Sequence, residues 1–184
     1  VAALFAGATP IVLKTSLVRP LGLDAAALIA SWAAIGGLTA WAGARTARAE
    51  RFGAIVLAIP ASGSAMMLLL GQYSMLHGQS AGIVAAALAG VALASALGGR
   101  LAPGVGVVAA LVVTFAHIQG HLFAPSPRSW VFTGLTAAGF VLPAFVRSET
   151  APRLRRSLLR LALASAPVAV GVGLAIATRV DGSM

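Results

Sequence analysis

The sequence predicts an all-α integral membrane protein, folded as one polytopic helix bundle in a single transmembrane domain over residues 1–184. Of the 184 residues 59% are hydrophobic and only 9% are charged, and the mean hydropathy is +0.97. These values lie far outside the range of soluble globular proteins and indicate several membrane spans. The apolar residues also fall into runs of about 20, which is the length one helix needs to cross a bilayer.

Six apolar runs predict about six transmembrane helices, at residues 25–43, 52–73, 80–98, 104–123, 130–146 and 161–178. A further apolar stretch at residues 1–13 contains Pro10 and is too short for a standard span, so we expect an N-terminal half-span there. This stretch lacks the basic n-region of an intact signal peptide.

The second span and the loop after it contain local sequence patterns that affect the expected helical structure. The centre of the second span reads Pro60-Ala-Ser-Gly-Ser64, a pattern at which helical hydrogen bonds can break. A helix broken at this point would either line a substrate path or only be kinked within the packed bundle. A short loop containing His77 is expected to follow it and to lead into the third span.

Two of the spans carry a regular face of small side chains, which would let another helix approach closely. In the third span these residues are Gly82, Ala86, Gly90, Ala94 and Gly98, and in the sixth they are Ser165, Ala169, Gly173 and Ala177. The partner helix could belong to the same chain, to a second copy or to another subunit of a membrane complex. The lipid bilayer is the other expected partner.

The distribution of Lys and Arg predicts the orientation. Nine of the 13 basic residues lie in the segments after the first, third and fifth spans. By the positive-inside rule this side is cytoplasmic and both termini lie outside. The same rule explains the net charge of +9 without a nucleic-acid partner.

The three histidines provide the strongest functional signal. His117 and His121 stand four residues apart on one helix, a spacing that can present two imidazoles to one metal ion. The predicted topology places both of them, His77 and Asp24 on the external side, where Asp24 is a candidate N-cap of the first span. Imidazoles and a carboxylate suit Ni, Co, Zn or Cu(II).

Other uses of these histidines have to be considered. The pair could serve structural hydrogen bonds, and His77 could be a solvated loop residue. The two histidines are unsuited to bind one haem, because the two axial ligands of a haem iron approach from opposite sides of the haem plane. His117 and His121 stand on one face of one helix.

The residues offer little for catalysis, and we expect no enzymatic activity. The chain contains four acidic residues and no cysteine. It also lacks a G-x-S-x-G motif that would identify a nucleophilic serine. A divalent transition metal ion is therefore the only bound group that the sequence suggests.

Two motifs resemble those of the HupE/UreJ family, which consists of small permeases associated with nickel supply to hydrogenase and urease. Arg19-Pro20-Leu21-Gly22-Leu23-Asp24 resembles the early His-Pro-x-x-Gly-x-Asp-His motif of the family. The later Phe-His-Gly-x-Ala-His-Gly motif is matched by Phe115-Ala116-His117-Ile118-Gln119-Gly120-His121. The resemblance implies that Asp24, His117 and His121 are metal-path residues. Arg19 and Ala25, however, stand where the family has its two early histidines.

From these observations we expect a permease-like protein of the bacterial inner membrane. It would transport or bind a divalent transition metal of the nickel or cobalt class through an outward-facing histidine site. Two alternatives are a non-catalytic scaffold subunit of a larger membrane complex and a channel for small solutes.

Overall fold

The computed structural model describes residues 23–49, 52–71, 75–96, 102–123, 127–146 and 153–181, and these residues are almost entirely helical. The α-helices are α2 (Leu23–Ala49), α3 (Gly53–Gly71), α4 (Met75–Ala96), α5 (Pro103–Phe123), α6 (Pro127–Val141) and α7 (Arg153–Asp181), and a 3₁₀ turn, η1 (Leu142–Phe145), extends α6. The all-α class is confirmed. The predicted half-span at residues 1–13 lies outside the described residues.

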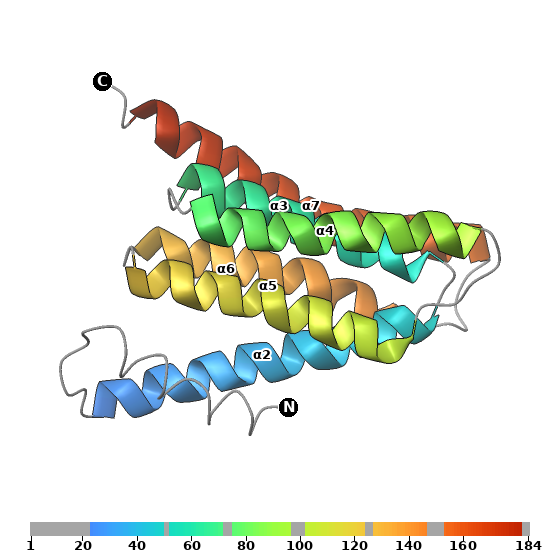
Figure 1. The fold of residues 1–184 in the computed structure, drawn as a ribbon, viewed down its shortest axis with the longest axis horizontal. Helices are drawn as coiled ribbons and strands as arrows, with labels where there is room; N and C mark the ends of the chain where they lie inside the picture. Colours follow the sequence, from blue (N-terminus) through green and yellow to red (C-terminus); the bar gives the residue numbers. More distant parts are fainter. Residues whose placement is uncertain are drawn as a thin grey trace.

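Consecutive helices run in opposite directions along one common axis (Figure 1). Helices α2, α4 and α6 begin at one end of the bundle, where α3, α5 and α7 finish. We call this the histidine end, because His77 lies in the first turn of α4 and His121 in the last turn of α5. The opposite end is called the arginine end, because Arg48 is in the last turn of α2 and α7 begins there.

Within the described residues, four helices have the length and apolar composition needed to cross a membrane: α3, α4, α5 and α7. Helix α6 contains only 15 residues before η1, which corresponds to about 22 Å of rise, whereas the hydrocarbon core is about 30 Å thick. Helix α2 is not among the four either. A membrane-embedded helical protein is thus supported, but these measures do not confirm all six predicted spans.

Three local expectations were wrong. Residue His77 lies inside α4 rather than in a loop. Helix α7 starts at Arg153, in a segment expected to be a loop, because arginine is a good helix former and can extend a span beyond its apolar part. Helix α3 continues through the Pro60–Ser64 segment without a break. Pro60 is buried there, and a Cβ at Gly139 of α6 would lie only 3.1 Å from its Cβ.

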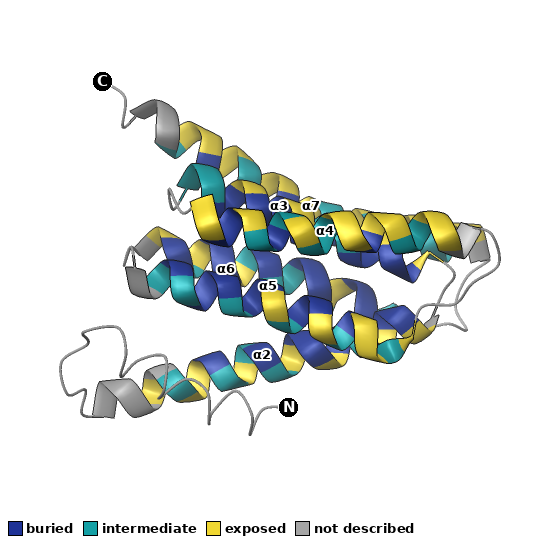
Figure 2. Ribbon diagram, viewed as in Figure 1, coloured by how far each residue is buried: buried dark blue, intermediate teal, exposed yellow. Residues whose placement is uncertain are grey.

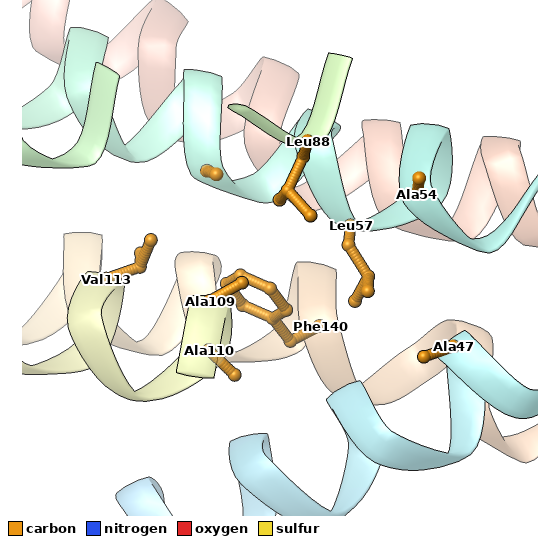
Figure 3. Close-up of a cluster of buried hydrophobic side chains, with 9 residues drawn as sticks. Ala47, Ala54, Leu57, Leu88, Ala109, Ala110, Val113 and Phe140 are labelled. Carbon is orange, nitrogen blue, oxygen red and sulfur yellow. The ribbon is translucent and has the colours of Figure 1, made fainter. Parts of the chain in front are cut away.

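The interior of the bundle centres on α3, which packs against α4 and α7 and also contacts α5 and α6 (Figure 2). The largest buried cluster gathers residues from five helices, with Phe140 of α6 among Leu57, Leu88 and Val113 (Figure 3). Large apolar side chains such as Ile83 and Leu93 of α4 and Val170 of α7 are exposed on the outside. This distribution suits a bundle surrounded by lipid.

Most members of the small-residue faces of α4 and α7 point outward. Among the described residues, a Cβ at Gly90 or Gly173 would meet no heavy atom within 4 Å. Other exposed members are Ala86, Ala94, Ala169 and Ala177, whereas Gly82 is half-buried near Ala65 of α3 and Gly98 lies outside the described residues. Contacts within the described chain therefore do not account for most of these faces, and a role between chains stays a prediction.

Candidate functional site at the histidine end

His117 is fully buried among α3, α5 and α6. Its Nε2 lies 2.7 Å from Oγ of Ser64 on α3 and 3.1 Å from Oγ1 of Thr136 on α6. Its Nδ1 is also buried and has no hydrogen-bond partner among the described residues. Because a hydroxyl can donate or accept, the two hydroxyls can satisfy Nε2 in either tautomer. One buried polar atom of the ring is therefore left unsatisfied by the part of the chain that the structure describes.

His121 lies one turn further along α5 and packs in an aromatic cluster. Its Nδ1 is 2.5 Å from Oγ of Ser129 on α6. Its ring centroid is 5.0 Å from that of Trp130 and 6.1 Å from that of Trp32. The two indoles stack on each other with centroids 4.7 Å apart. Helices α2, α5 and α6 are thus joined by aromatic contacts at the histidine end.

His77 is buried, with 7% of its surface exposed, and the side chain of Gln119 on α5 hydrogen-bonds to it. The interpretation of His77 as a solvated loop residue is therefore wrong. The first turn of α4, which contains His77, packs closely on α3, where a Cβ at Gly78 would overlap the side chain of Leu69. Alternation of the helices thus brings all three histidines to one end, as the topology predicted.

The predicted ligand set of His117, His121, His77 and Asp24 is not seen as one cluster. Asp24 is the second residue of α2, so it lies within the first turn rather than at the N-cap, and its side chain lies outside the described residues. Among the residues that the structure describes, no group of three or more His, Cys, Asp or Glu side chains is close enough to hold a metal ion.

Sequence reasoning missed the hydroxyls around His117. Thr39 of α2 and Thr114 of α5 are both buried, and their Oγ1 atoms lie 3.1 Å apart. Oγ1 of Thr39 also donates to the carbonyl oxygens of Ile35 and Gly36. Thr114 stands three residues before His117 on α5, so the two residues share one helix face. This spacing could have identified the Thr114 hydroxyl from the sequence.

Comparison of the chain with protein-family models, with curated proteins and with solved structures finds no match. The resemblance to the HupE/UreJ family therefore stays a prediction. The buried polar groups of the bundle lie inside a membrane-compatible fold, where such groups commonly have a function.

Proposed function

We propose that the protein is a permease-like integral membrane protein that carries a divalent transition metal ion of the nickel or cobalt class. The observation that carries this proposal is His117, a fully buried imidazole whose Nδ1 has no hydrogen-bond partner in the described part of the chain. Ionisable side chains are costly inside a membrane and commonly mark a path for ions or substrates. The proposal assigns no catalytic reaction to the chain.

The hydrogen bonds of the two late histidines support metal binding. Histidine ligands of metals commonly use one ring nitrogen for the ion and the other for a hydrogen bond that orients the ring. His117 uses Nε2 for Ser64 and Thr136, which leaves Nδ1. His121 uses Nδ1 for Ser129, which leaves Nε2. Each imidazole therefore has its ring held by a hydrogen bond at one nitrogen, which is the arrangement common among metal-binding histidines.

The proposed setting is the bacterial inner membrane, with all six helices crossing it and the histidine end outside. The arginine end carries an aromatic and basic cluster that suits a membrane interface. Trp41 and Phe145 are exposed there with ring centroids 5.7 Å apart, and the guanidinium of Arg45 lies 5.5 Å from the Trp41 ring. In this orientation the metal would reach His121 first and His117 second.

Calorimetric titration of the purified protein with nickel, cobalt, zinc and copper tests the proposal. His117→Ala and His121→Ala should each weaken binding of the preferred ion. If both residues hold one ion, the metal affinity of the double variant should be little lower than that of the single variant that binds more weakly. His77→Ala is the control, because His77 pairs with Gln119 and the family resemblance does not include it. Equal binding by the wild type and the double variant would overturn the proposal.

The second candidate is a scaffold subunit of a larger membrane complex. The specific observation in its favour is that the small-residue faces of α4 and α7 point outward, with open space around Gly90 and Gly173. Small residues on an outer face allow a partner helix to approach closely in a membrane. Absence of metal binding, together with co-purification of a stoichiometric membrane partner, would favour this candidate.

A further inference from the structure

A layer of uncharged polar side chains crosses the interior of the bundle at the level of His117. We call it the polar layer, and its members are Thr39, Ser64, Thr114, His117 and Thr136. All five are buried, and they come from α2, α3, α5 and α6. Hydrogen bonds join Thr39 to Thr114 and His117 to both Ser64 and Thr136. The layer offers one imidazole nitrogen and four hydroxyl oxygens, and imidazole is a ligand that suits nickel.

On the side of the histidine end, the polar layer is covered by aromatic rings. The indole of Trp32 is almost completely buried and stacks on Trp130, with His121 against both rings. The Nε1 atom of Trp32 is buried, and none of the described residues forms a hydrogen bond with it. This contact therefore depends on aromatic packing, which contributes about 0.5–1.5 kcal/mol per pair beyond the buried area.

On the side of the arginine end, the backbones of α2 and α5 touch. A Cβ at Gly43 would overlap the carbonyl oxygen of Gly106, and a Cβ at Gly106 would overlap that of Gly43. Ala47 and Ala110 are buried beside this contact. No side chain fits between the two helices here, so the contact closes the interior below Thr39 and Thr114.

Both closures depend on α2. Residues Trp32, Thr39 and Gly43 are separated by seven and four positions, which places them on one face of the helix. Helix α2 lies at the edge of the bundle and packs chiefly against α5 (Figure 1). At the arginine end it also touches α3, because a Cβ at Gly53 would lie 2.8 Å from the carbonyl oxygen of Thr46. Opening at that end therefore also parts α2 from α3, whereas the contacts of α3 with α4 and α7 do not involve α2.

We propose that α2 is a gate helix that encloses a cargo-binding site formed by the polar layer. Parting of Trp32 from Trp130 opens this site toward the histidine end, and parting of Gly43 from Gly106 opens it toward the arginine end. The identity of the cargo rests on the proposed transport function, but the opening of α2 can be tested without any metal.

The absence of native cysteine allows a clean labelling experiment in reconstituted membrane vesicles. Thr114→Cys introduces a reporter thiol in the polar layer. Val113→Cys is the matched control, because Val113 is equally buried but belongs to the apolar cluster around Phe140. A small, charged, impermeant methanethiosulfonate is applied to either side of the membrane. We expect Thr114→Cys to react at least about tenfold faster than Val113→Cys, because the gate exposes only the polar layer.

Two further changes test the two closures separately. Trp32→Ala should accelerate labelling of Thr114→Cys by about tenfold from the side of the histidine end, which corresponds to a loss of about 1.4 kcal/mol from the closed contact. Gly43→Ala should accelerate it from the opposite side, because the added methyl group forces α2 away from α5. Trp130→Ala and Gly106→Ala provide a second variant for each closure if one of the first pair does not fold.

The side of the acceleration decides the outcome. Faster labelling from opposite sides by the two kinds of variant supports the gate. Unchanged labelling, acceleration from the same side by both, or an equal rise in the Val113→Cys control would overturn it. Because no metal is added, gated labelling without calorimetric binding would refute only the metal cargo. Binding without gated labelling would refute only the gate.

Discussion

The Oγ1 atoms of Thr39 and Thr114 lie 3.1 Å apart in the buried contact between α2 and α5. The same helix contact brings the backbones of Gly43 and Gly106 together one turn further along α2. A hydroxyl pair inside an apolar bundle holds two helices in register, and a glycine pair lets them approach closely. These two pairs therefore define how the middle of α2 packs against α5.

The hydroxyl pair should contribute modestly to stability. Thr114→Val keeps the shape of the side chain but removes the bond to Thr39, so it should lower the free energy of unfolding by about 0.5–1 kcal/mol. Thr39→Val should act similarly. The double variant should lose less than the sum of the two, because both changes remove one shared bond. Equilibrium unfolding in mixed micelles measures these values, and strict additivity would show that the hydroxyls do not interact.

The glycine pair should tolerate no side chain. Gly106→Ala should lower the free energy of unfolding by about 1–3 kcal/mol, because the new methyl group would overlap the backbone of α2. Gly104→Ala is the matched control on the same helix, since a Cβ there would meet no heavy atom within 4 Å. The control should be neutral or slightly stabilising, because alanine favours helix. Comparable melting temperatures for the two variants would contradict the close α2–α5 contact.

The outer face of α4 should affect assembly rather than folding. Gly90→Leu should leave the thermal stability of an isolated chain nearly unchanged, because the space around Gly90 is open. If that face joins two chains, the same change should shift the oligomer toward monomer, whereas Ile83→Leu should not. Light scattering of the detergent-solubilised protein measures the mass. A clear loss of monomer stability in Gly90→Leu would show that the face packs within the chain.

The basic residues should hold the arginine end in the cytoplasm. Leu154 of α7 and Met75 of α4 are strongly exposed at opposite ends of the bundle, so cysteines there report the orientation. In intact cells Met75→Cys should react with an impermeant thiol reagent, and Leu154→Cys should react only after the membrane is opened. The reverse labelling pattern would place the histidines inside.

Metal binding should depend on pH in one direction. A proton and a metal ion compete for the same lone pair of an imidazole nitrogen, so the apparent affinity should fall as the solution becomes more acidic. Calorimetric titration over a series of pH values measures this dependence. The His117→Ala/His121→Ala variant should lose both the binding and its pH dependence, whereas an unchanged profile would place the metal elsewhere.

The linear sequence was sufficient to predict the helical membrane class and the end at which the histidines lie. Apolar runs predict helices because the backbone must satisfy its own hydrogen bonds in lipid. An alternating path of the chain then places His77, His117 and His121 at one end, as observed. The family resemblance singled out His117 and His121 but contained no information about their hydrogen-bond partners.

The tertiary structure decided which face of each helix points inward. Helices α3 and α4 are apolar on all sides, so the hydrophobic pattern along the chain does not define their rotation. Packing alone turns Ser64 toward His117 and leaves Gly90 on the outer surface. It also pairs Thr39 with Thr114, which are 75 residues apart in the sequence. Contacts between distant residues depend on helix rotation and close packing, and neither can be derived from hydrophobicity along a single chain.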